Sequence, residues 1–207
     1  MKKLLLKVCG LREPDNIQAV SALGVDMLGF IFYPPSPRYV GIEGAAIKSL
    51  APGQKRVGVF VNETPEAMTA IAEAYSLDAL QLHGQESPEH CLDLRSRFSI
   101  IKAFPIAEAA DFDQTKNYEG TCDYFLFDTK GPSHGGNGFA FDWNILDAYT
   151  GSTPFLLSGG ISPDDALKIK AIQHPKLAGL DLNSRFEISP GLKNVKTLSA
   201  FFNLIMR

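Results

Sequence analysis

Residues 57–75, VGVFVNETPEAMTAIAEAY, contain one complete unit of the fold: an apolar run, a short turn and an amphipathic helix. The run at 57–61 has little polar alternation, which is typical of a strand buried on both faces of a parallel sheet. Thr64 and Pro65 then supply an N-cap and a proline at the first helical position. Apolar side chains at helical spacing follow on one face. They are Met68, Ile71 and Tyr75.

The same pattern recurs along the 207 residues at an average spacing of about 25 residues. The apolar runs begin near Leu4, Met27, Lys55, Ala79, Ile100, Tyr124, Phe155 and Gly179. Ser87 with Pro88, and Ser162 with Pro163, repeat the capping signal. Eight such units in succession imply parallel strands with right-handed crossovers, and eight parallel strands can close into a barrel. The sequence therefore predicts an α/β fold, a (β/α)8 TIM barrel, as one domain over residues 1–207. An open, doubly wound sheet is the alternative.

Composition excludes several function classes. A net charge of −3 gives no basic surface for nucleic acid, so we expect no nucleic-acid partner. Three cysteines are an odd, sparse set that indicates a reducing cytoplasm rather than a disulfide framework. The first apolar run ends at Lys7, too early for a signal peptide, and no run is long enough to span a membrane. The four histidines lack metal-ligand spacing, so we expect a cytoplasmic protein without a metal.

Two strands end in side chains that can move protons. Cys9 closes the first strand beside Gly10, and Asp128 closes the sixth. In a barrel both lie at the C-terminal mouth, where active sites are built. A buried cysteine is more often inert, and an aspartate there is as often a cap. As a base the thiol needs a lowered pKa, because a thiol of pKa ~8.5 is only about 3% thiolate at pH 7.

The two longest strand-to-helix connections, 33–41 and 129–141, lie on the same face. The first holds Arg38 among prolines that stiffen the backbone, so its guanidinium can take a carboxylate by two hydrogen bonds. A solvated arginine is the alternative. His83 follows the fourth strand and either contacts a ligand, orients its neighbours or lies unused at the rim. Asp181 and Asn183, near the eighth strand, are ambiguous because such polar groups are often satisfied within the fold.

A phosphate site is predicted after the seventh and eighth strands. Gly159 and Gly160 follow the seventh strand and precede a capped helix. Asn183, Ser184 and Arg185 follow the eighth. Glycines let a phosphate approach backbone N–H groups, and barrels often keep a phosphate at these two connections. Either segment alone also fits an ordinary turn.

With these segments in place, the chain resembles N-(5′-phosphoribosyl)anthranilate isomerase of tryptophan biosynthesis over nearly its whole length. The matching segments are Lys7-Val8-Cys9-Gly10, Ser36-Pro37-Arg38, Gln81-Leu82-His83-Gly84, Phe127-Asp128-Thr129, Gly135-Gly136-Asn137-Gly138, Phe141-Asp142-Trp143, Ser158-Gly159-Gly160 and Pro190-Gly191-Leu192-Lys193. Each is short, and their shared order on consecutive strands makes the set specific. The chain departs from the family at 183–185, where small Ser-Ser-Gly-type residues are common.

The resemblance implies an isomerase of the intramolecular aldose–ketose class. It would convert N-(5-phosphoribosyl)anthranilate to 1-(2-carboxyphenylamino)-1-deoxyribulose 5-phosphate by a cofactor-free Amadori rearrangement. By the same resemblance, Asp128 protonates the furanose ring oxygen, Cys9 removes the C2′ proton, and Arg38 receives the anthranilate carboxylate. His83, Gly136 and Gly138 would contact the substrate.

Two other functions fit a phosphate-binding barrel. A lyase related to indole-glycerol-phosphate synthase or to an aldolase would use a lysine or an extra carboxylate at a strand end. Lys7 and Lys102 are candidates, and neither comes with a convincing partner. A non-catalytic binding barrel would keep the glycines but has no use for Cys9 together with Asp128. The sequence leaves open whether the protein is a monomer or a homodimer.

Overall fold

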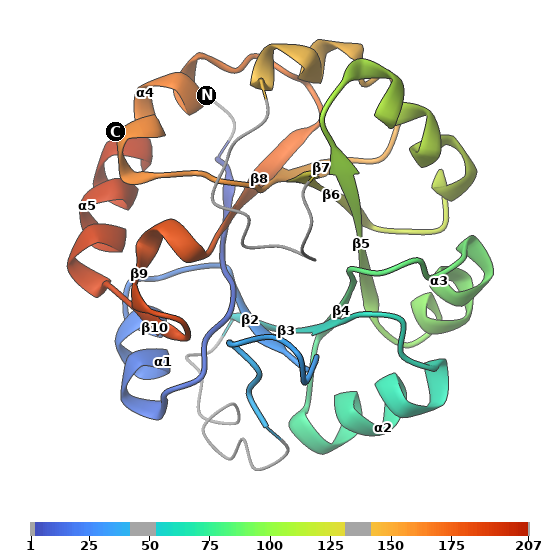
Figure 1. The fold of residues 1–207 in the computed structure, drawn as a ribbon, viewed down its shortest axis with the longest axis horizontal. Helices are drawn as coiled ribbons and strands as arrows, with labels where there is room; N and C mark the ends of the chain where they lie inside the picture. The colour runs from blue at the N-terminus through green and yellow to red at the C-terminus, as the bar shows by residue number, and fades with distance from the viewer. Residues whose placement is uncertain (1–2, 42–52, 131–141, 207) are drawn as a thin grey trace.

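The computed structural model describes residues 3–41, 53–130 and 142–206. Eight parallel strands close into a barrel in chain order, from β1 to β8 (Figure 1). The strands are β1 Leu5–Val8, β2 Met27–Ile31, β3 Lys55–Phe60, β4 Ala79–Leu82, β5 Ser99–Ile106, β6 Tyr124–Thr129, β7 Phe155–Leu157 and β8 Leu177–Leu182. The predicted TIM barrel is confirmed, and the open-sheet alternative is wrong.

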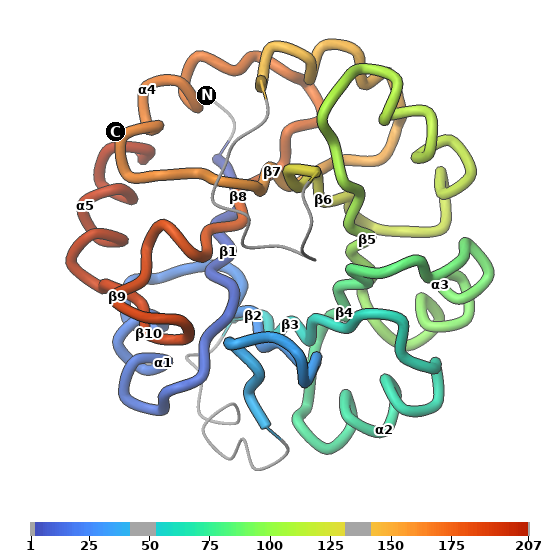
Figure 2. The backbone as a smooth tube through the Cα atoms, in the orientation of Figure 1, coloured from blue at the N-terminus to red at the C-terminus, as the bar shows by residue number. Residues whose placement is uncertain are grey.

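The barrel closes where β1 pairs with β8, in the register Leu5–Gly179 to Val8–Leu182. Figure 2 shows this closure as the blue start of the chain beside the orange-red eighth strand. Lys7 stands opposite Asp181 in this register. Two segments at opposite ends of the sequence therefore share the inner wall of the barrel.

Helical segments surround the strands (Figure 1). They are α1 Pro14–Ser21, α2 Pro65–Tyr75, α3 Pro88–Arg95, η2 Ala109–Tyr118, η3 Trp143–Ala148, η4 Pro163–Asp165, α4 Ala166–Ala171, η5 Ser184–Phe186 and α5 Val195–Met206, where η marks a 3₁₀ helix. A two-stranded hairpin, β9 Glu187–Ser189 with β10 Leu192–Lys193, lies between η5 and α5.

The capping signals act as the sequence predicts. The Thr64 side chain accepts a hydrogen bond from Ala67 N at 3.2 Å and opens α2. Ser87 accepts one from His90 N at 3.4 Å and opens α3. Ser162 instead precedes one 3₁₀ turn, η4, before α4 begins.

Inward-facing side chains change character along the barrel axis. A lower apolar cluster fills the barrel, formed by Met27, Val57, Ala79, Ile101, Ala103, Leu126, Leu156 and Ala178. Above it the same strands carry polar residues two positions further on, such as Gln81 after Ala79 and Asp128 after Leu126. Because strand side chains alternate between faces, these polar groups also point inward. The barrel is thus sealed below and polar at its C-terminal mouth.

Candidate active site

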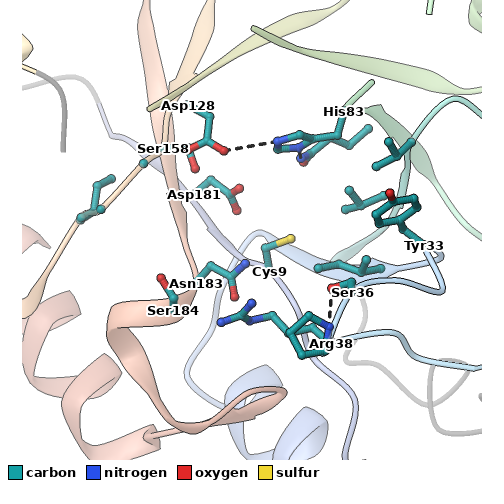
Figure 3. A pocket seen from close by; sticks show the side chains of 18 of the residues that line it. Cys9, Tyr33, Ser36, Arg38, His83, Asp128, Ser158, Asp181, Asn183 and Ser184 are labelled. Atoms are coloured by element: carbon teal, nitrogen blue, oxygen red, sulfur yellow. Dashed lines mark hydrogen bonds and ion pairs between the residues drawn. The ribbon is translucent and has the colours of Figure 1, made fainter. Parts of the chain in front are cut away.

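A cavity of about 240 Å³ opens at the C-terminal mouth of the barrel. Its lining includes Cys9, Arg38, Gln81, His83, Asp128, Ser158, Gly159, Gly160, Asp181, Asn183 and Ser184. In Figure 3 Asp128, Asp181 and Asn183 stand on one side, His83 and Tyr33 on the other, and Cys9 lies between them. Eight of the predicted site residues meet here: Cys9, Arg38, His83, Asp128, Gly159, Gly160, Asn183 and Ser184.

Cys9 lies just beyond the end of β1, held by a hydrogen bond from its backbone N to Leu182 O at 2.9 Å. Only 3% of the residue is exposed. Gly29 on the neighbouring β2 makes room for it, because a Cβ at Gly29 would lie 2.8 Å from Cys9 Sγ. The glycine in an otherwise apolar strand is therefore explained by the thiol beside it.

The environment of the thiol differs from the expected one. Burial is the largest influence and raises the pKa of Cys9, with a smaller increase from the Asp181 carboxylate. Lys7 and Lys193 act in the opposite direction without outweighing the burial. The sequence-based expectation of a lowered thiol pKa is therefore not met by the protein groups alone.

Asp128 and His83 form a contact across the cavity. His83 Nε2 lies 3.3 Å from Asp128 Oδ2, and Thr129 N donates to Asp128 Oδ1 at 2.8 Å. On the other side of the ring, Gln81 Nε2 lies 2.8 Å from His83 Nδ1. With the amide nitrogen as donor, Nδ1 is the acceptor and Nε2 carries the proton that faces Asp128. His83 thus contacts the candidate acid and is not idle at the rim.

Arg38 reaches the cavity from the loop after β2 but is already engaged. Its Nε and Nη2 donate to both carboxylate oxygens of Glu187 on β9, at 2.8–3.1 Å. None of the described residues accepts a hydrogen bond from Nη1 of Arg38. The carboxylate of Glu187 also accepts from Lys193 Nζ at 2.6 Å and from Gly191 N at 3.1 Å. A ligand carboxylate would therefore meet a guanidinium whose orientation Glu187 fixes.

The predicted phosphate segments are only partly brought together. Gly159 and Gly160 have φ of +81° and +68°, which explains two consecutive glycines. Ser184 starts η5 at the same cavity. Asn183 Oδ1 accepts from Lys193 Nζ at 2.7 Å, so its side-chain oxygen is already bonded. Arg185 is exposed and does not line the cavity. Gly136 and Gly138 lie outside the described residues.

The structure adds pairings and residues that sequence reasoning missed. Lys7 is fully buried and pairs with Asp181 at 2.8 Å, and the buried Lys102 pairs with Glu86 at 3.3 Å. The view that neither lysine has a partner was wrong, since both carboxylates come from other strands or loops. Gln81, Glu187 and Lys193 were also missed. The period-two alternation of Lys7 with Cys9, and of Gln81 with His83, was the available signal.

Among the described residues there is no cluster of three or more His, Cys, Asp or Glu side chains that could hold a metal ion. Within the described ranges, no helix is long and apolar enough to cross a membrane.

Comparison with known proteins agrees with this geometry. A family described as "N-(5'phosphoribosyl)anthranilate (PRA) isomerase" matches residues 6–204. The N-(5'-phosphoribosyl)anthranilate isomerase of Parabacteroides distasonis is 53% identical over 98% of this chain and 94% of its own length. The protein of that name from Phocaeicola vulgatus is 45% identical, covering 97% of each chain.

Solved structures agree as well. Phosphoribosyl anthranilate isomerase from Thermotoga maritima superposes with a TM-score of 0.88 at 33% identity, covering 99% of each chain. A phosphoribosyl anthranilate isomerase in complex with reduced 1-(o-carboxyphenylamino)-1-deoxyribulose 5-phosphate gives 0.85 at 30% identity, again with 99% of each chain covered. On this sequence and structural evidence, the chain belongs to the N-(5′-phosphoribosyl)anthranilate isomerase family.

Proposed function

We propose that this chain isomerises N-(5-phosphoribosyl)anthranilate to 1-(2-carboxyphenylamino)-1-deoxyribulose 5-phosphate, with Asp128 as the acid and Cys9 as the base. One observation carries the assignment of roles: a carboxyl group from β6 and a thiol from β1 open onto the same cavity. An acid and a base that open onto one cavity can act on two atoms of the same ligand.

Ring opening is the first step. The protonated Asp128 gives its proton to the furanose ring oxygen as the C1′–O bond breaks, and the anilino nitrogen lone pair forms the C1′=N bond of a Schiff base. His83 Nε2, 3.3 Å from Asp128 Oδ2, holds the carboxyl group in place.

Proton removal is the second step. The Cys9 thiolate takes the proton from C2′, and the C–H electrons form the C1′=C2′ bond while the C1′=N electrons return to nitrogen. The resulting enolamine gains a proton at C1′ and loses one from the 2′ hydroxyl, which gives the ketone. Electrons move only within the substrate, so the balance requires no redox partner.

Two anchors would hold the ends of the substrate. Arg38, oriented by Glu187, suits the anthranilate carboxylate. Backbone N–H groups at Gly159, Gly160 and Ser184 suit the phosphate, because glycines allow close approach. The ligand is thus a phosphorylated small molecule. The proposed setting is the cytoplasm, and both monomer and homodimer remain compatible with the proposal.

Loss of either proton carrier tests the proposal. Cys9→Ala and Asp128→Asn should each lower kcat by about 10²- to 10⁴-fold, the usual effect of losing a general acid or base. Turnover is followed by the loss of anthranilate fluorescence. Cys122→Ala, which removes another buried thiol outside the cavity, is the matched control and should keep its kcat. Near-normal kcat in either Cys9→Ala or Asp128→Asn would refute the assigned roles.

A further inference from the structure

Lys7 lies directly behind the thiol of Cys9, on the same side of β1. The two residues are two positions apart in an extended segment, so both side chains point into the barrel. Lys7 is 0% exposed and does not line the cavity. An ammonium group in such a place is expensive to bury and requires compensation from neighbours.

Two groups supply that compensation. Asp181, opposite Lys7 in the β1–β8 register, places Oδ1 2.8 Å from Lys7 Nζ. The Cys9 thiol, two positions further along the same inward face, is the second and adds a favourable electrostatic interaction with the ammonium group. Burial opposes the charge of Lys7, but Asp181 and Cys9 outweigh it and raise the pKa of Lys7. The raised pKa keeps Lys7 protonated beside Cys9.

We propose that Lys7 is the positioning residue that makes Cys9 usable as a base, its ammonium group stabilising the thiolate that burial alone disfavours. Asp181 keeps that ammonium group charged. The inference rests on the proposed function, because it takes Cys9 to be the base.

The charges around the sulfur come from several elements. Lys7 on β1 and Lys193 on β10 are positive, and Asp181 on β8 is negative. Asp128 and His83 face the same cavity from β6 and the end of β4, and Arg38 faces it from the loop after β2. Lys193 is bound to Glu187 and Asn183, at 2.6 and 2.7 Å. Lys7 differs from Lys193 by its position two residues before Cys9, on the same inward face of the extended segment.

A purely structural ion pair is the competing explanation, since a buried pair can often be replaced by apolar residues at little loss of stability. The two explanations differ in what happens to the sulfur. If Lys7 acts on Cys9, its removal changes the pH at which the thiolate forms. If Lys7 only neutralises the charge of Asp181, replacing both residues leaves the pH at which the Cys9 thiolate forms unchanged.

The test measures alkylation of Cys9 by iodoacetamide against pH, in protein with Cys91→Ala and Cys122→Ala. Lys7→Met should raise the midpoint by about 1–3 pH units, the effect of losing an opposite charge at close range, and slow alkylation at pH 7 about tenfold or more. The double variant Lys7→Met with Asp181→Asn should raise the alkylation midpoint by less, because no unpaired carboxylate then faces the sulfur. Either variant suffices if the other does not fold.

Kinetics separate this inference from the proposed function. In Lys7→Met, kcat should fall with the same pH dependence as alkylation, while KM stays nearly constant because Lys7 does not line the cavity. The matched control is Lys102→Met with Glu86→Gln, which removes another buried ion pair of the barrel and should leave the alkylation midpoint unchanged. An unmoved midpoint in folded Lys7 variants would overturn the inference. A shifted midpoint with unchanged kcat would instead uphold the effect of Lys7 on the thiol and refute Cys9 as the base.

Discussion

At the scale of single residues, the site is built from pairs in which one member orients the other. Arg38 is the clearest case, because Glu187 takes its Nε and Nη2 groups and thereby fixes the plane of the guanidinium. An arginine held in this way loses little conformational freedom when a carboxylate binds. The prolines of the loop limit the backbone, and Glu187 limits the side chain.

Arg38→Ala should therefore weaken substrate binding by roughly 1.5–3 kcal/mol, the range for a hydrogen bond to a charged group. Arg38→Lys should recover only part of this, because the forked geometry is lost. Glu187→Gln should raise KM by less than Arg38→Ala and leave kcat nearly unchanged. Steady-state KM values of the three variants rank these effects. Equal KM in wild type and Arg38→Ala would mean that the anthranilate carboxylate binds elsewhere.

At the scale of elements, the turn after β7 is the tightest part of the site. Gly159 has a φ of +81°, and a Cβ there would lie 2.4 Å from Thr129 N and 2.9 Å from Asp128 Oδ1. The ends of β6 and β7 are thus packed against each other through a residue without a side chain. The position of Asp128 depends on that glycine.

Gly159→Ala should displace the end of β6 and lower kcat/KM by at least about tenfold, since small misplacements of reacting groups slow catalysis strongly. Gly120→Ala is the matched control, because Gly120 has a similar φ of +77° but nothing within 4 Å of its added Cβ. That variant should lose only about 1–2 kcal/mol of stability from the left-handed backbone and keep its activity. Equal activity in the two variants would contradict a role for the turn.

Local sequence determined most of the elements. The predicted strand starts at Met27, Lys55, Ala79, Tyr124 and Phe155 coincide with β2, β3, β4, β6 and β7. The start near Gly179 was two residues late, because Leu177 already pairs with Phe155. Strands 5 and 6 are followed by the 3₁₀ segments η2 and η3 rather than by α-helices, and η2 is rich in Asp, Asn and Thr, which are weak helix formers.

The candidate site was less accessible to sequence reasoning. Cys9 and Asp128 could be identified because each follows an apolar run that predicts a strand. Arg38 could be identified because it lies in a loop that prolines stiffen. The partners Asp181, Glu187 and Glu86 were missed as partners because a pairing across the barrel depends on register, which no local pattern states.

At the scale of the whole molecule, carboxylates also fasten the outer loops. Glu119, in the connection between η2 and β6, accepts hydrogen bonds from Ser152 and Thr153 in the connection before β7 and from Tyr149 Oη. Burial favours its neutral form, but these hydrogen bonds outweigh burial and lower the pKa of Glu119. The pKa of Glu187 is lowered as well, by Arg38 and Lys193 against the opposing effect of burial.

Acid should therefore destabilise the fold. A carboxylate whose pKa is lowered in the folded state stabilises the protein above its ordinary pKa, 4.5 for a glutamate, and loses that contribution as the pH falls through the folded value. The melting temperature should be nearly constant down to about pH 5 and fall below it. Glu119→Gln should start from a lower melting temperature at pH 7 and fall less steeply with acid. An equally steep fall in Glu119→Gln would exclude this carboxylate as a source of the acid sensitivity.

The closure of the barrel has a consequence for the order of events on the ribosome. Lys7 and Asp181 are 174 positions apart, and the backbone of Cys9 is held by Leu182. Translation delivers the thiol well before the strand that completes its surroundings, because six other strands lie between them in the sequence, and synthesis proceeds at about 5–20 residues per second. A nascent chain carrying only the first seven strands has an open sheet edge, and Lys7 lacks Asp181, its partner on β8. The surroundings of Cys9 are therefore completed in one step, when β8 leaves the exit tunnel and pairs with β1.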